Sequence, residues 1–177
     1  MRCLITLVTL AAACGGSPPP QKPPVTPPSS GVHATLVVGG PGDGVTMATL
    51  TDGQDVSLVE GAQGGFHVWL EFRARDVAAG TLTLERSAHR VSDGAVVLRY
   101  DGPITIGDAG ADGWWQAAEF PMFMCPTPIG ISIVGEPIAY QLRLVDDGGA
   151  ELARAGVTLV PRCPDAQLPF CTRICTG

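Results

Sequence analysis

Four cysteines in the last third of the chain could form disulfides or bind a metal: Cys125, Cys163, Cys171 and Cys175. An even number of thiols in an oxidising compartment predicts two disulfides, for which three pairings are possible. We favour Cys125–Cys163, which would join the ends of two strands, and Cys171–Cys175, which would close a small loop in the tail. A four-cysteine zinc site is the alternative, although the paired C-x₂-C spacing of zinc knuckles is missing.

Two other sets of side chains could bind a metal. Met122 and Met124 present thioethers on one face of a predicted strand, and His67 or His33 could complete a copper site. Residues that alternate in this way along a strand are typical of a hydrophobic core, so the simpler interpretation is that Met122 and Met124 are core residues. A calcium site could instead use carboxylates in predicted turns, namely Asp101, Asp108, Asp112, Asp146 and Asp147. Hairpin turns commonly contain Asp-Gly pairs for structural reasons, so we expect no metal and no cofactor.

Aromatic residues give a third candidate site, a binding face. His67 and Trp69 fall on the polar face of the clearest predicted strand, and one indole of the Trp114-Trp115 pair must point away from the core if that stretch is extended. Exposed aromatic residues are typical anchors of interfaces. The alternative is that Trp69 is covered by a loop or by the tail and completes the packing.

Catalytic signatures are missing from the sequence. It has no H-E-x-x-H, no G-x-S-x-G and no P-loop, and its glycines do not space as G-x-G-x-x-G. A triad assembled from distant positions around His33, His67 or His89 is the remaining route to a hydrolase. We therefore expect no enzyme activity.

The segments that would position these residues alternate with a period of two. In residues 66–75, Phe66, Val68 and Leu70 share one face, while His67 and Trp69 share the other. This alternation favours an antiparallel sheet with one solvated side. Strands are expected at 34–38, 45–50, 56–60, 66–75, 81–86, 95–100, 114–124, 138–145 and 151–160, and no stretch has a convincing helical pattern.

Six Asp-Gly pairs separate these strands and predict hairpins and turns. Eight or nine short strands joined in this way indicate an all-β, immunoglobulin-like antiparallel β-sandwich over residues 32–163, with a jelly roll or small barrel as the alternative. Residues 138–145 and the last strand, joined at Asp146 to Gly149, resemble the closing F–G hairpin of an immunoglobulin-like domain. The tail, residues 164–177, is expected to be held by disulfides because it is short and interrupted by prolines.

Residues 1–13 have the pattern of a signal peptide. Arg2 supplies a positive charge, residues 4–10 form an apolar stretch too short to span a bilayer, and three alanines precede Cys14. With Cys14 and the following Gly15-Gly16-Ser17, the leader resembles that of bacterial lipoproteins, whose lipobox ends in a modified cysteine. The resemblance implies cleavage before Cys14 and lipidation of its sulfur and amino group. Three acyl chains would give stable membrane anchoring.

The segment between anchor and domain, residues 14–31, is a proline-rich linker that holds seven prolines between Ser17 and Ser30. In an extended polyproline conformation it would raise the domain about 40 Å above the lipid. A proline-rich ligand for a partner domain is the alternative.

Removing Arg2 with the leader leaves 10 basic against 17 acidic residues, so the formal charge moves from −6 to −7. Such an acidic chain argues against nucleic acid as a partner and against electrostatic docking on anionic lipid. Together these features predict a binding or structural module of the bacterial cell envelope, anchored by lipid and facing the periplasm or the cell surface, with an envelope protein or glycan as partner. Metal binding through calcium or copper, and less favoured hydrolysis, are the alternatives.

Overall fold

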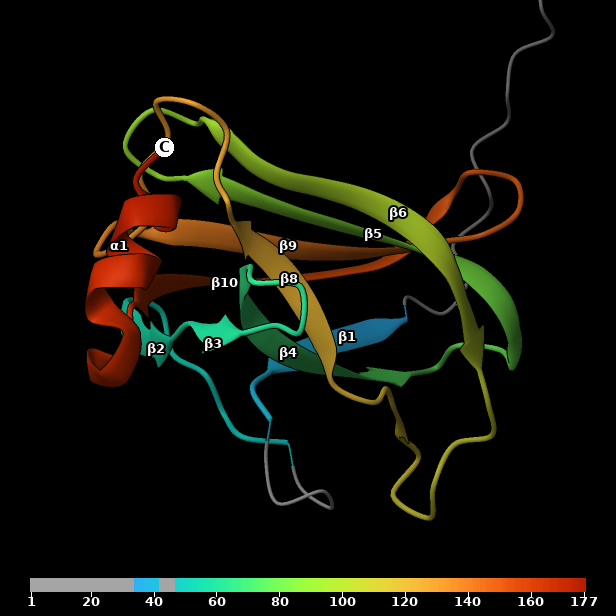
Figure 1. Ribbon diagram of the computed structural model, residues 1–177. Helices are drawn as coiled ribbons and strands as arrows, with labels where there is room; N and C mark the ends of the chain where they lie inside the picture. The colour runs from blue at the N-terminus through green and yellow to red at the C-terminus, as the bar shows by residue number, and fades with distance from the viewer. Residues whose placement is uncertain (1–33, 42–46) are drawn as a thin grey trace, which may run out of the picture. The chain divides into compact units, whose positions relative to one another are not determined.

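A computed structural model describes residues 34–41 and 47–177 (Figure 1). The predicted signal peptide, Cys14, the proline-rich residues 14–31 and His33 lie outside the described residues, so the predictions made for them stay predictions. Within the described residues the chain forms ten strands, a 3₁₀ turn and a helix: β1 (Thr35–Gly39), β2 (Gln54–Ser57), β3 (Val59–Glu60), β4 (Phe66–Arg75), β5 (Gly80–Arg90), β6 (Val96–Ile106), β7 (Trp115–Gln116), β8 (Phe120–Cys125), β9 (Ile138–Val145), β10 (Glu151–Arg162), η1 (Asp165–Gln167) and α1 (Leu168–Cys175).

The first sheet is built around β4, which pairs antiparallel with β1, β3, β7 and β8. Strands β1 and β7 both pair with residues 73–74 of β4, so they lie on opposite edges of β4. Strands β3 and β8 both pair with residues 66–67, so they too lie on opposite edges. Strands β7 and β8 follow one another in nearly continuous register along one edge. On the other edge, β1 pairs with residues 71–75 and β3 with residues 66–67, which leaves a gap beside residues 68–70.

The second sheet has the order β2-β10-β9-β5-β6. Its neighbours are antiparallel except for β2, which pairs parallel with the end of β10. The predicted closing hairpin is confirmed as β9–β10, whose turn is fixed by Asp146: its Oδ1 accepts from the N–H groups of Gly148 at 2.9 Å and Ala150 at 2.8 Å. Strand β6 forms one edge of this sheet.

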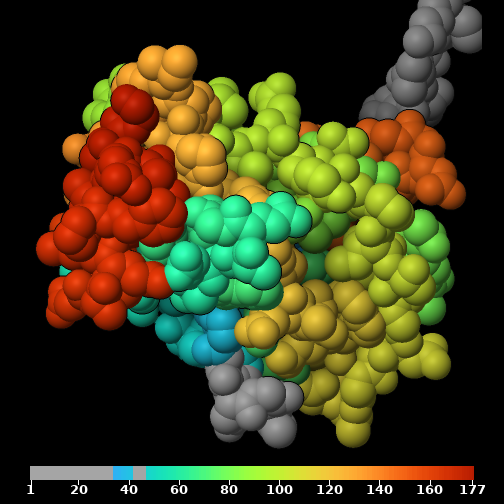
Figure 2. Space-filling model, in the orientation of Figure 1, coloured from blue at the N-terminus to red at the C-terminus, as the bar shows by residue number. Residues whose placement is uncertain are grey.

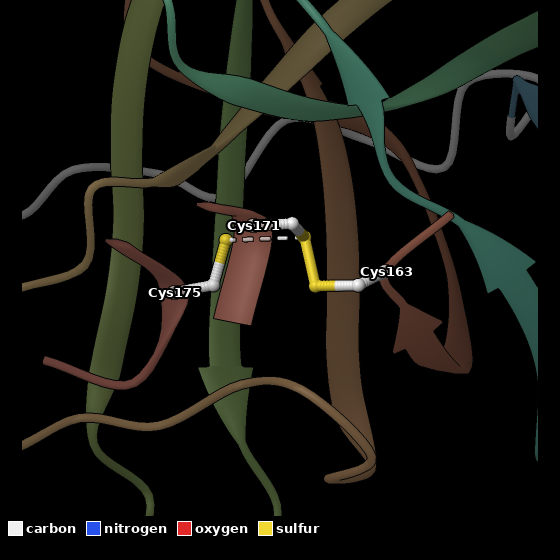
Figure 3. A group of neighbouring side chains, drawn as sticks. All are labelled: Cys163, Cys171 and Cys175. Carbon is white, nitrogen blue, oxygen red and sulfur yellow. Dashed lines mark hydrogen bonds between the residues drawn. A yellow bond between two sulfur atoms is a disulfide. The ribbon is translucent and has the colours of Figure 1, made fainter. Parts of the chain in front are cut away.

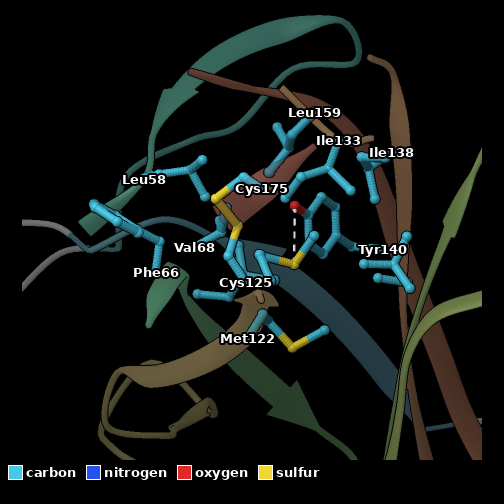
Figure 4. Close-up of a cluster of buried hydrophobic side chains, with 14 of the residues drawn as sticks. Leu58, Phe66, Val68, Met122, Cys125, Ile133, Ile138, Tyr140, Leu159 and Cys175 are labelled. Atoms are coloured by element: carbon cyan, nitrogen blue, oxygen red, sulfur yellow. Dashed lines mark hydrogen bonds between the residues drawn. A yellow bond between two sulfur atoms is a disulfide. The ribbon is translucent and has the colours of Figure 1, made fainter. Parts of the chain in front are cut away.

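The core lies between the inner faces of the two sheets (Figure 4). The inward residues of β4 are buried at 0–2% exposure, and those of β9, from Ile138 to Leu144, at 0–2% as well. Met122 and Met124 belong to this core, where the Tyr140 hydroxyl donates to the Met124 sulfur at 3.5 Å. The predicted β-sandwich is therefore confirmed, in a form compatible with an immunoglobulin-like domain.

Several stretches differ from the sequence prediction. Residues 56–60 divide between β2 and β3, which belong to different sheets, and β6 continues through the predicted turn at Asp101-Gly102. Residues 114–124 form two strands instead of one, because residues 118–119 leave the ladder after the bond from the Ala117 N–H to the Phe72 carbonyl. Of the strand expected at 45–50, the described part forms only a single bridge between Ala48 and Gly40. The tail forms α1, which was not expected; Pro169 in its first turn suits a helix start, because that turn needs no N–H donor there. No helix in the described ranges is long and apolar enough to cross a membrane.

All four described cysteines form disulfides, but the favoured pairing was wrong. The bonds are Cys163–Cys171 (Figure 3) and Cys125–Cys175 (Figure 4). Because α1 is helical, Cys171 and Cys175 lie four residues apart on one face, and each reaches the end of a different strand. Cys171 bonds to the residue after β10, and Cys175 bonds to the last residue of β8. The tail is thus fastened to both sheets.

Candidate functional site

The outward face of β4 is less exposed than the sequence alternation indicates. His67 is 5% exposed and Glu71 is 7% exposed. The His67 ring packs edge-on against Phe123 at 4.3 Å, and burial lowers the pKa of its imidazole, which favours the neutral ring. The expectation of a wet face was therefore wrong for these two residues, since Phe123 of β8 packs on His67 and the side-chain amide of Gln116 donates to the Glu71 carboxylate at 3.1 Å.

The tryptophan pair divides between the two faces, as strand alternation requires. Trp115 points inward and packs against Phe72 with ring centroids 5.6 Å apart. Trp114 lies outside, with the guanidinium groups of Arg73 and Arg75 at 5.2 and 4.8 Å from its ring. Of the predicted binding face, the structure brings His67 and Trp69 together at 6.4 Å and turns Trp115 away.

A groove of about 650 Å³ lies beside Trp69, at the gap that β1 and β3 leave along β4. Trp69 faces Pro121 in the β4–β8 ladder. Pro121 has no N–H, and its carbonyl accepts from the Nη1 of Arg86 at 3.3 Å. The N–H and C=O of Trp69 therefore point to the opposite edge of β4, into the groove. The half-buried indole and its backbone together form one wall.

Polar side chains from distant segments line the rest of this groove. Gln54 and Asp55 come from β2, and Glu119 comes from the turn before β8. Leu50 and Val59 add apolar surface, Val59 being 46% exposed. An aromatic ring beside carboxylate and amide groups can hold a ligand that has both apolar faces and hydrogen-bond donors. Sequence reasoning missed the polar three, because nothing in their local patterns links them to Trp69.

The metal-binding residue sets do not converge among the described residues. Met122 and Met124 face the core, whereas His67 lies on the outer side of the same sheet. The turn aspartates are dispersed: Asp112 pairs with Arg73, and Asp146 caps its own turn. The one group of potential ligands within reach of a single ion in residues 34–41 and 47–177 is Cys163, Cys171 and Cys175, whose sulfurs are in disulfides.

A nucleophile paired with a base is equally missing from the described part of the chain. The Nδ1 of His67 is buried without a hydrogen-bond partner there. His89 and Ser87 share a face of β5 and line a pocket of about 390 Å³ with Asp101. Asp101 pairs across from Glu85, four residues along β5 from His89, so these groups are too spread out for a triad.

Comparisons with known proteins add little. No protein-family model matches the chain, and no curated protein matches it. Among solved structures, a chain described as the N-terminal domain of PorA is similar, with 14% identity, a TM-score of 0.33, and coverage of 71% of this chain and 96% of that one. A likeness this distant does not bear on function.

Proposed function

We propose that this chain is a lipid-anchored binding module of a bacterial cell envelope, and that the groove beside Trp69 recognises a glycan. The observation that carries the proposal is the joining of a half-buried indole to Gln54, Asp55 and Glu119 in one groove of about 650 Å³. A sugar ring has C–H faces that pack on an indole and hydroxyls that donate to carboxylates. Asp55 is already paired with Arg162 at 3.0 Å, so the carboxylate of Glu119 is the one that favours a neutral or amino sugar over an acidic one.

The binding half of the proposal is tested with purified peptidoglycan sacculi as the probe. The full chain is incubated with sacculi, and the bound fraction is measured against protein concentration for wild type, Trp69→Ala and Trp114→Ala. Trp69→Ala should weaken binding by about tenfold or more, the loss expected for an aromatic anchor. Trp114→Ala is the matched control, because that indole contacts two arginines and does not line the groove. Equal loss in both variants, or no binding by the wild type, would refute glycan recognition at Trp69.

The anchoring half of the proposal rests on the leader and on Cys14. Cells that express the wild type and a Cys14→Ser variant are labelled with a radioactive fatty acid and fractionated. We expect label and membrane association in the wild type and neither in the variant, because a single thiol carries the attachment in bacterial lipoproteins. Membrane association that survives Cys14→Ser would contradict lipid anchoring.

A further inference from the structure

A second cleft opens between the two sheets, on the side away from the β1–β3 gap. Strand β6, the edge of the second sheet, faces the β7–β8 edge of the first sheet across it, and Figure 2 shows the atoms of these segments in yellow-green and gold. The cleft has a volume of about 350 Å³. Its walls are mainly apolar, from Leu84, Ile104, Trp115 and Phe120. This volume lies within the range of small-molecule sites.

An arginine lies in this apolar cleft. Arg86 is on β5 in register with Leu142, so its side chain extends from the core-facing side of the sheet. Its guanidinium carbon lies 4.2 Å from the centre of the Tyr100 ring and 5.3 Å from that of Phe120. Burial lowers the pKa of the guanidinium, although Tyr100 opposes the shift, and an arginine remains protonated at neutral pH.

The charge of Arg86 has no opposite charge beside it. Three other partly buried arginines, Arg73, Arg90 and Arg143, form ion pairs with carboxylates. Within the described residues no ion pair includes Arg86. Its Nη1 donates to the Pro121 carbonyl at 3.3 Å, and its Nε is buried without a partner. A partly desolvated cation with unused donors is costly unless an anion compensates it.

We propose that the cleft between β6 and β7–β8 binds a small carboxylate that carries an apolar body, with the carboxylate on Arg86 and the body between Ile104, Trp115 and Phe120. The planar guanidinium suits a carboxylate, because its parallel N–H groups match two oxygens, and the apolar walls suit the body that a carboxylate carries. Both halves of such a ligand would find complementary surface in the same cleft. This site is separate from the groove beside Trp69.

The test compares two probes of the same shape, one with a charged carboxylate and one with a neutral amide. Binding of 4-phenylbutanoate and of its neutral amide, 4-phenylbutanamide, to the full chain is measured by isothermal titration calorimetry at pH 7. The acid should bind about tenfold or more tightly than the amide, since charge-assisted hydrogen bonds are roughly twice as strong as neutral ones. This comparison needs no variant, so it stands even if a substitution at Arg86 prevents folding. Equal affinities, or no binding of the acid, would overturn the proposal.

Variants then locate the site. Arg86→Met keeps an apolar stem of similar reach and should reduce binding of the acid to the level of the amide. Arg99→Met is the matched control, because Arg99 is an exposed arginine on the neighbouring strand whose side chain does not line the cleft. Trp69→Ala should leave the affinity unchanged, which separates this proposal from glycan recognition. Loss of binding in Trp69→Ala but not in Arg86→Met would place the probe in the other groove and refute the assignment to Arg86.

Discussion

Removing each disulfide separately tests whether the stapled tail stabilises the domain through chain entropy. Cys125–Cys175 joins residues 50 positions apart, whereas Cys163–Cys171 joins residues 8 apart and lies inside the larger loop. The loop-entropy relation gives about 4 kcal/mol for the larger loop and about 2.5 kcal/mol for the smaller one at 25 °C. With the inner bond intact, the outer loop shortens by 8 residues, from 50 to 42, which changes its contribution by only about 0.2 kcal/mol.

Both cysteines of a pair have to be replaced together. The Sγ atoms of Cys171 and Cys175 lie 3.9 Å apart, so a single thiol left at Cys175 could attack the neighbouring disulfide and change the pairing. Urea unfolding at 25 °C without reductant is therefore measured for Cys125→Ala/Cys175→Ala and for Cys163→Ala/Cys171→Ala. The first variant should lose about 1.5 kcal/mol more free energy of unfolding than the second.

The packing lost with the buried sulfur atoms does not change which of the two variants should be less stable. Cys125, Cys171 and Cys175 are 0–3% exposed, so the first variant also removes at least as much packed volume as the second. If the two variants were equally stable, or if the short-loop variant were the less stable one, the loop-entropy argument would be wrong. The stability of the tail would then come from the packing of α1 against the strand ends.

Two further predictions concern single residues. A Cβ at Gly61 would lie 2.0 Å from the Nε2 of the packed His67 ring, so Gly61→Ala should lower the free energy of unfolding in urea by about 1–3 kcal/mol. The loss should be smaller in a His67→Ala background, and an equal loss there would contradict the clash. Hydrogen bonds from Arg154 and Arg143 lower the pKa of Glu151 to about 2 from 4.5, so this carboxylate stabilises the fold above pH 4.5 and loses that effect as the pH falls towards 2. Glu151→Gln should flatten the fall in the urea midpoint between pH 5 and pH 2, by a small amount because the pair is solvent-exposed, and an unchanged slope would contradict this assignment.

Much of the β-sandwich could be predicted because local pattern and tertiary burial agree. The bounds of β4 and β9 follow the alternation of Phe66 to Arg75 and of Ile138 to Val145, since each inward residue enters the core. The turn at Asp146 could also be predicted, because its side chain bonds to N–H groups within four residues. These features depend on interactions that are short in sequence or repeated every second residue.

The helix and the disulfide pairing could not be predicted in this way. Helix α1 has two turns, too few for a helical period to stand out, and its stability depends on strand ends that are distant in sequence. Without the helix, nothing indicates that Cys171 and Cys175 must reach different partners. The burial of His67 was missed for a related reason. Gly61 and Phe123 cover its ring, and the alternation of residues within β4 does not indicate which neighbouring segments will lie beside it.

The two candidate ligand sites show the same limit. Trp69 could be selected from its residue type and phase, whereas Glu119 and Asp55 join it only through the pairing of β4 with β8 and of β2 with β10. Arg86 gave no signal at all, since an arginine in an alternating strand is ordinarily a surface residue. Its inward direction follows from the register of β5 with β9.

The parallel pairing of β2 with the end of β10 constrains when the domain can form. Residues 54–57 find their partners only at residues 159–162, and Cys125 finds its partner only at Cys175. A growing chain therefore cannot complete the second sheet, or fasten the end of β8, until almost all of its residues have been synthesised. Such long-range pairing is typical of slow folding, and until then residues 54–57 would lack their partner strand and could associate with other chains. We expect incomplete chains that stop before residue 159 to aggregate instead of forming a smaller stable domain.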